Sequence, residues 1–134
     1  MLAQMLLAAL IKADAPEARE SRLCPLGGVQ QLRIYEIFEG NKAAFHARFR
    51  DHAHRIMKRH GFDIVAFWES GYADRTEFVY LLQWPNEAEM KQRWEAFMAD
   101  EEWARIKRET GAVHGQLVGE IEDRTLKRTN YSPC

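Results

Sequence analysis

The chain has 134 residues, of which 46% are hydrophobic and 29% charged, as in a single soluble globular domain. Its formal net charge of −1 excludes a whole-chain field that would attract nucleic acid or anionic lipid. No apolar run approaches the roughly 18 residues of a membrane span, so neither a nucleic-acid nor a membrane partner is expected. Cys24 and Cys134 make no disulfide framework, which favours free thiols and a cytoplasmic location.

The first 28 residues differ from the rest of the chain. They open with MLAQMLLAALIKADA, a short apolar run that no Lys or Arg precedes, so an amphipathic helix or an extension is favoured over a signal peptide. A polar stretch follows, and Pro25 with Gly27 and Gly28 interrupts the chain before a strand-like run. The sequence therefore predicts an N-terminal extension and linker over residues 1–28 and a domain over residues 29–134.

The first half of this domain predicts a strand, a helix and a hairpin. Residues 29–38 alternate at period two and are rich in β-forming side chains, which indicates a strand. Asn41 can cap the following helix, which ends at Gly61. Residues 62–71 and 76–84 then read as two strands joined by a short turn.

The second half predicts another helix and a last strand. Pro85 ends the third strand, and Asn86 with Glu89 resembles a capping box. The helix continues to Ile106 after a kink at Asp100, and residues 116–125 form the fourth strand. The order β-α-β-β-α-β is that of the ferredoxin-like α+β fold.

Both faces of the predicted sheet carry large apolar side chains. Alternation along the first strand places Arg33, Tyr35 and Ile37 on one face and Leu32 and Ile34 on the other. We expect the two helices to cover one face and Arg33 and Tyr35 to lie on the other. An aromatic-rich face without helices predicts burial against a second subunit, so a homodimer with two apposed sheets is expected.

Six short patches of the sequence resemble the NIPSNAP family. They are QLRIY (31–35), FRDHA (49–53), RHG (59–61), AFW (66–68), DEEW (100–103) and LKRTNYSP (126–133). Glu101 and Arg128 depart from the family pattern, which usually has Pro at both positions. The resemblance implies a dimeric α/β barrel formed by two subunits, with a pocket inside each half, and implies little about activity.

Four of the five histidines lie between positions 46 and 60. None of these four is spaced i,i+4 from another, so they cannot share a metal within one helix, and no metal site is predicted. Helical geometry places His54 toward water, His46 at the rim and His60 at the helix end. His52 falls on the buried face, as a satisfied core residue or as a base or ligand contact.

The face that carries Arg33 and Tyr35 is the predicted ligand site. One alternative is a buried ion pair at the dimer interface between Arg33 and a fourth-strand carboxylate, either from the set with Glu120 and Glu122 or from the set with Asp123. The other is a pocket that recognises a carboxylate, carbonyl or phenol, because Arg forks to such groups and Tyr donates a proton. Its walls are predicted to be Trp68, Tyr80 and Trp84.

These patterns predict a homodimer that binds a small aromatic or carbonyl-bearing molecule in its barrel pocket, with no cofactor. A first alternative is a cofactor-independent oxygenase, isomerase or lyase, in which Arg33 stabilises an enolate or oxyanion and Tyr35 or His52 moves the proton. A second alternative is a non-catalytic interaction or scaffold protein. An open pocket beside Arg33 and Tyr35 favours the small-molecule hypotheses, whereas a dry Arg33–carboxylate pair favours a structural role.

Overall fold

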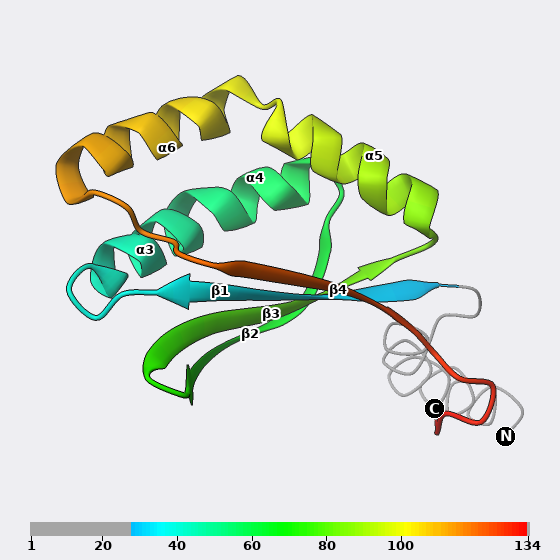
Figure 1. Cartoon of the computed structure of the whole chain (residues 1–134). Helices are drawn as coiled ribbons and strands as arrows, with labels where there is room; N and C mark the ends of the chain where they lie inside the picture. The colour runs from blue at the N-terminus through cyan, green and yellow to red at the C-terminus, as the bar shows by residue number, and fades with distance from the viewer. Residues whose placement is uncertain (1–27, 134) are drawn as a thin grey trace, which may run out of the picture.

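The computed structural model describes residues 28–133, so the N-terminal extension and both cysteines lie outside the described residues. Its frame is one four-stranded antiparallel sheet in the order β2-β3-β1-β4 (Figure 1). The strands are β1 (Val29–Ile37), β2 (Asp63–Tyr72), β3 (Arg75–Trp84) and β4 (Ile121–Lys127). The predicted ferredoxin-like arrangement is confirmed, although β4 begins at Ile121 rather than at residue 116.

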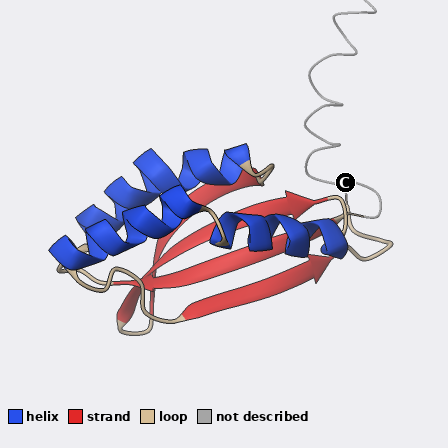
Figure 2. Cartoon of the chain, turned by 90° about the horizontal axis from the view of Figure 1, so that it is seen from above, coloured by secondary structure: helices blue, strands red, loops and turns tan. Residues whose placement is uncertain are grey.

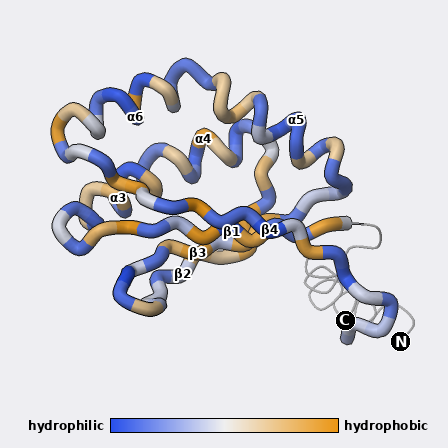
Figure 3. Tube along the Cα trace, in the orientation of Figure 1, coloured by the Kyte–Doolittle hydropathy of each residue, from blue (hydrophilic) through white to orange (hydrophobic). Residues whose placement is uncertain are grey.

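The helices of residues 28–133 all lie on one face of the sheet (Figure 2). They are α3 (Lys42–Arg48), η1 (Phe49–Ala53), α4 (His54–Arg59), α5 (Glu87–Met98) and α6 (Glu101–His114). Hydrophilic and hydrophobic residues interleave along α4, α5 and α6, as expected of helices with one face toward a core (Figure 3). Within residues 28–133, every helix is too short or too polar to cross a bilayer.

The sheet register corrects the predicted position of the site. Arg33 lies opposite Tyr80, Tyr35 lies opposite Phe78, and these side chains face the helices instead of the open side. Leu32 and Ile34 occupy the open face with Val79 and Leu81. Alternation determines which residues share a face, but it does not determine which face the helices cover, because both faces of β1 and β3 are rich in apolar groups.

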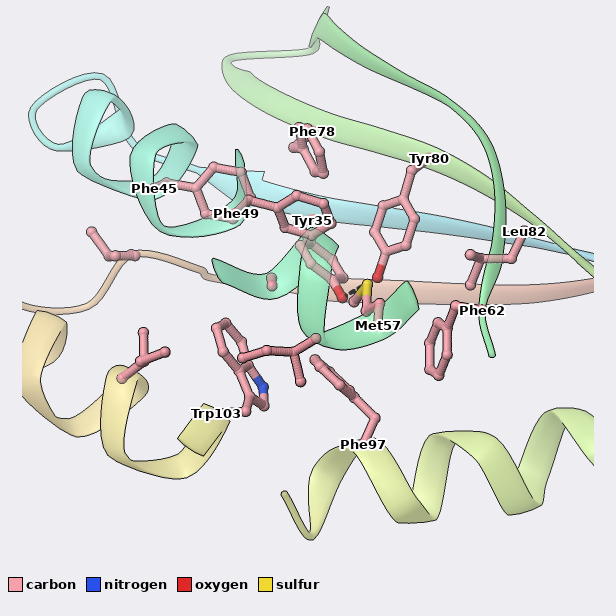
Figure 4. Close-up of a cluster of buried hydrophobic side chains, with 14 of the residues drawn as sticks. Tyr35, Phe45, Phe49, Met57, Phe62, Phe78, Tyr80, Leu82, Phe97 and Trp103 are labelled. Atoms are coloured by element: carbon pink, nitrogen blue, oxygen red, sulfur yellow. Dashed lines mark hydrogen bonds between the residues drawn. The ribbon is translucent and has the colours of Figure 1, made fainter. Parts of the chain in front are cut away.

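The core is a layer of aromatic side chains between the sheet and the helices. Phe45 and Phe49 pack on Phe78 with ring centroids 5.0 and 4.7 Å apart, and Phe97 stacks on Trp103 at 5.4 Å. Figure 4 shows these rings approaching Tyr35 and Tyr80 from opposite sides of the core. Aromatic pairs at these separations contribute beyond the area that they bury.

A π-helical turn, η1, divides the predicted first helix. One turn with i→i+5 bonding adds a residue, so side chains after Phe49 rotate relative to a continuous α-helix. Consequently His54 packs edge-to-face on Phe67 with centroids 5.0 Å apart, instead of pointing to water as predicted. His52 is only half-buried, and its Nδ1 accepts a hydrogen bond from Arg55 at 3.0 Å, so its predicted place on the buried face is also wrong.

Two predicted helix caps have different outcomes. Asn86 caps α5, because its side chain accepts a hydrogen bond from the backbone N–H of Glu89 at 2.8 Å. Asn41 makes no side-chain cap; its amide instead donates to the carbonyl oxygens of His114 and Gln116 at 3.1 and 2.9 Å. Asn41 therefore joins the start of α3 to the end of α6.

Asp100 separates α5 from α6, at the predicted kink. Its Oδ1 accepts the backbone N–H of Trp103 at 3.0 Å, and its Oδ2 lies 2.8 Å from both His60 Nε2 and Arg59 Nη2. The hydrogen bond with His60, then that from Trp103 and the cation of Arg59, hold the pKa of the Asp100 carboxyl well below its ordinary value. One carboxylate thus ties the junction of α5 and α6 to the end of α4.

We expect Asp100→Ala to lower the free energy of unfolding at pH 7 by about 1–2 kcal/mol, because a cap and its charged partners are lost together. Asp100→Asn should cost less, since the amide oxygen still accepts from the helix. The pKa of Asp100 is lower in the folded than in the unfolded chain, so its contribution is present above about pH 4 and is lost as pH falls. Urea unfolding of the variants at pH 7 and pH 3 measures this difference.

Glu109→Ala on the exposed side of α6 is the matched control and should change stability by less than about 0.5 kcal/mol. An equal loss in Asp100→Ala at both pH values would contradict the electrostatic part of the explanation.

Candidate ligand-binding site

A cavity of about 210 Å³ lies between the sheet and the helices. Side chains from β1, α3, η1, α4, α5, α6 and the segment that leads into β4 surround it. Its lining comprises Arg33, Tyr35, Phe45, Arg48, Phe49, Met57, Trp94, Phe97, Met98, Trp103, Lys107, Val118 and Ile121. Met98 and Ile121 are more than half exposed, so the cavity reaches the surface between α5 and the start of β4.

Arg33 contributes a guanidinium to the cavity from the centre of the sheet. Its Nη1 pairs with Asp123 Oδ2 on β4 at 3.1 Å, and its Nη2 donates to the Tyr35 hydroxyl at 3.1 Å. The guanidinium also stacks on the Trp94 ring, 4.4 Å from the centroid. Burial alone lowers the pKa of Arg33, but Tyr35 and Tyr80 raise it by more, so the group is always charged.

Two tyrosine hydroxyls meet beside Arg33. The Oη atoms of Tyr35 and Tyr80 are 2.5 Å apart, and Figure 4 shows the two side chains converging on that contact. Burial raises the pKa of Tyr80 well above its ordinary value, so Tyr80 is a neutral phenol at pH 7. Tyr35 lines the cavity, whereas Tyr80 is fully buried behind it.

Gln31, beside Arg33 on β1, forms hydrogen bonds that fix the positions of Trp84, Trp94 and Asp123. Its Oε1 accepts the indole N–H groups of Trp84 and Trp94 at 2.9 and 2.7 Å, and its Nε2 donates to Asp123 Oδ1 at 2.9 Å. Gln31 is itself 1% exposed. A continuous polar network therefore runs from the two tryptophans through Gln31 and Asp123 to Arg33 and the tyrosines.

Comparison with known proteins agrees with this architecture. The sequence profile of the NIPSNAP family matches residues 30–133. The chain belongs to the NIPSNAP family. No curated protein sequence matches it.

Solved structures of the family share the fold at low identity. A NIPSNAP-like domain protein from Burkholderia xenovorans is 16% identical with a TM-score of 0.67, over 81% of this chain and 90% of that chain. A NIPSNAP protein of unknown function from Agrobacterium tumefaciens is 20% identical with a TM-score of 0.67, over 82% and 96%. SnoaB, a cofactor-independent oxygenase from Streptomyces nogalater, is 14% identical with a TM-score of 0.50, over 80% and 98%. At such identities the likeness shows the fold alone.

Two of the seven predicted site residues of this NIPSNAP domain, Arg33 and Tyr35, line the cavity, and Tyr80 supports Tyr35 from behind. Trp84 is buried against Phe62 and bonded to Gln31, so it stands behind the wall. The other three do not line the cavity. The strand pairing places Trp68 and Glu122 on the open face of the sheet. His52 lies on the outer side of η1, where it contacts Arg55.

Glu122 is not the carboxylate that pairs with Arg33. The register of β1 and β4 sets Arg33 opposite Asp123, whereas Glu122 lies opposite Ile34 on the open face and binds Arg124 at 2.6 Å. Arg33 makes an ion pair and also borders a cavity, but both lie on the helix-covered face and not at the predicted interface between two sheets.

Sequence reasoning missed the residues that the helices contribute. Arg48, Trp94, Trp103 and Lys107 line the cavity, but the sequence patterns predict no site role for them. The available signal is weak, because tryptophans on the core-facing side of a helix and cations beside them are common. Gln31 carried a better signal, since it alternates with Arg33 and Tyr35 on a strand whose helix-covered face is buried.

The lining can donate hydrogen bonds and hold an anion, but it offers little basicity. Neither a carboxylate nor a histidine belongs to the lining as described, whereas two arginines, a lysine and a tyrosine do. Within residues 28–133, no three His, Cys, Asp or Glu side chains gather closely enough to hold a metal ion. The arrangement suits recognition and stabilisation of an oxyanion more than abstraction of a proton.

Gln31→Leu should lower the free energy of unfolding by about 2–4 kcal/mol. The substitution leaves two indole N–H groups without an acceptor, and a buried unsatisfied donor costs about 1–3 kcal/mol. Urea denaturation followed by tryptophan fluorescence measures the change. Gln92→Leu on the exposed side of α5 is the control, and equal effects in the two variants would disprove the role of Gln31.

Proposed function

We propose that this NIPSNAP domain binds a small molecule that has an aromatic ring and a carbonyl or phenol oxygen. The observation that supports this proposal is the Tyr35–Tyr80 pair at the floor of the cavity. Tyr80 is buried, and the Tyr35 oxygen is the only acceptor recorded for its hydroxyl among residues 28–133. Because a buried donor requires an acceptor, Tyr80 donates to Tyr35.

This direction leaves the Tyr35 proton for a ligand. The Tyr35 oxygen accepts from Tyr80 and from Arg33 Nη2, and neither bond uses the proton of Tyr35 itself. Tyr35 is therefore a preorganised donor toward a carbonyl or phenol oxygen in the cavity.

The walls define the shape of the ligand. Phe45, Phe49, Trp94, Phe97 and Trp103 present mainly ring surfaces to the cavity. At about 210 Å³ the cavity is smaller than the roughly 300–1,000 Å³ of pockets for drug-sized ligands. A single substituted ring fits this volume and these walls better than a fused polycyclic system.

We expect Tyr35→Phe to weaken binding of acetophenone, a neutral aromatic ketone, by about 10-fold, because one hydrogen bond in a dry site is lost. Tyr72→Phe on the exposed end of β2 is the control and should bind as the unmodified protein does. Isothermal titration calorimetry measures both. Binding of acetophenone with equal affinity to all three proteins would remove Tyr35 from the site.

A second candidate function is cofactor-independent catalysis by oxygenation, isomerisation or lyase chemistry. Arg33 and the Tyr35 hydroxyl converge at one end of the cavity and could stabilise an enolate or phenolate oxygen. SnoaB, whose fold is similar, is a cofactor-independent oxygenase. The absence of His and carboxylates from the described lining favours substrates that are already acidic. After incubation in air, mass spectrometry of bound compounds detects oxygenation or cleavage and NMR spectroscopy detects isomerisation, so together they distinguish turnover from binding.

A non-catalytic scaffold remains the third hypothesis. It is favoured if native mass spectrometry of the purified protein finds no bound molecule and none of the small aromatic carbonyl compounds binds. The predicted cytoplasmic location suits all three functions and stays a prediction.

We also propose that two copies of the chain associate through the open face of the sheet. Leu32, Ile34, Val79 and Leu81 are apolar and only half-buried on this face, which no helix within residues 28–133 covers. Trp68 on β2 extends the patch and is 48% exposed. Contiguous apolar surface of this kind is typical of subunit interfaces.

Leu81→Glu should convert the dimer to a monomer, because it buries a charge without a partner in the centre of the interface. Light scattering at micromolar concentration measures the mass, and circular dichroism checks that the variant is folded. Lys91→Glu on the exposed side of α5 should remain dimeric. A monomeric unmodified protein under these conditions would refute the dimer.

A further inference from the structure

We infer that the ligand of the cavity is an anion, an aromatic carboxylate, and that Arg48 and Lys107 receive its charged group. The inference rests on the proposed binding function and specifies its ligand class. It derives from the distribution of charge around the cavity. Three cations line the cavity, and only Arg33 has a carboxylate partner among the described residues.

Arg48 is the stronger of the two unpaired cations. It is the last residue of α3 and is half-buried, and its Nη1 donates to the neutral Thr110 hydroxyl at 3.1 Å. Burial lowers the pKa of Arg48, and no carboxylate is among the groups that act on it. A partly buried charge without a counter-ion is costly, and an anionic ligand would compensate that cost.

Lys107 extends the same positive region from α6. Its Nζ lies 5.7 Å from the centroid of the Trp103 ring, and the Arg48 guanidinium lies 5.4 Å from the same centroid. The two cations therefore gather around one aromatic ring at the border of the cavity. An aromatic acid can lie along this ring surface while its carboxylate reaches the cations.

The neighbouring acidic residues are committed to other partners. Glu102 binds Arg55 and Arg59, and Asp100 binds Arg59 and His60. Asp123 is bound to Arg33 and Gln31. Within residues 28–133, the structure records no ion pair for Arg48 or Lys107, so the lining keeps two uncompensated positive charges.

The cavity thus has two polar regions with different chemistry. Beside Tyr35, the Arg33 charge is balanced by Asp123, which suits a neutral carbonyl or phenol oxygen. Beside Trp103, the charge is unbalanced, which suits a carboxylate. A ring that carries a carbonyl group at one end and a carboxylate at another satisfies both regions.

The test compares acids with neutral amides of the same shape. The probes are 3- and 4-acetylbenzoate and the corresponding 3- and 4-acetylbenzamides, titrated by calorimetry into the full chain. We expect at least one acid to bind about 10- to 100-fold more tightly than its amide, as for a hydrogen bond between charged groups. The preference should decrease at high salt.

Arg48→Gln should abolish most of that preference, because it should weaken binding of the acid far more than binding of the amide. Lys107→Gln should also reduce the preference for the acid over the amide. This variant replaces Arg48→Gln in the test if Arg48→Gln does not fold. Arg50→Gln is the matched control, because Arg50 is exposed and pairs with Asp51 away from the cavity. The control should keep the full preference.

The outcomes separate the two proposals. Equal binding of acid and amide by the unmodified protein, or an undiminished preference in both Arg48→Gln and Lys107→Gln, overturns the anion inference and leaves the proposed binding function intact. Failure of every acid, every amide and acetophenone to bind overturns the proposed function and the inference with it.

Discussion

A half-buried arginine beneath the helices, Arg33, is the constraint on which the site depends. Arg33 lies in the central strand β1, where an unpaired charge would be costly. Asp123 balances its charge, Tyr35 accepts one of its N–H groups and Trp94 covers its face. Asp123 belongs to β4, Tyr35 to β1 and Trp94 to α5. The contacts of Arg33 therefore fix the relative positions of these three elements. The polar floor of the cavity is a consequence of satisfying this charge.

Satisfying Arg33 also determines what its surroundings can do. Asp123 is held by Gln31, which in turn accepts both indole N–H groups, so this side of the cavity is rigid and electrically balanced. No comparable compensation exists at Arg48 and Lys107, within the part of the chain that the structure describes. The fold therefore separates a preorganised neutral donor at Tyr35 from an uncompensated positive region at Trp103.

The fold was predictable from the sequence, and the site only in part. Alternation along β1 and β3, the cap at Asn86 and the interruption at Asp100 act locally, so they give the element order correctly. The side of the sheet under the helices is a global property, and it was assigned wrongly for Arg33 and Tyr35. The π-turn η1 has no sequence signature as clear as a cap, and it moves His52 and His54 away from their predicted positions.

The solved structures of the family show the fold of this chain and not its ligand, because their sequence identity to it is low. Structures that are 16–20% identical keep the same layers, which shows that the fold tolerates replacement of most side chains. The cations beside Trp103 belong to helix surfaces, where substitution costs little stability. Charge at such positions can change without loss of the fold, so the ligand of this chain has to be inferred from its own lining. Arg48 is the main support for the inferred anionic ligand. Its half-buried charge has no carboxylate partner, which lowers the stability of the fold, so its presence is better explained by binding.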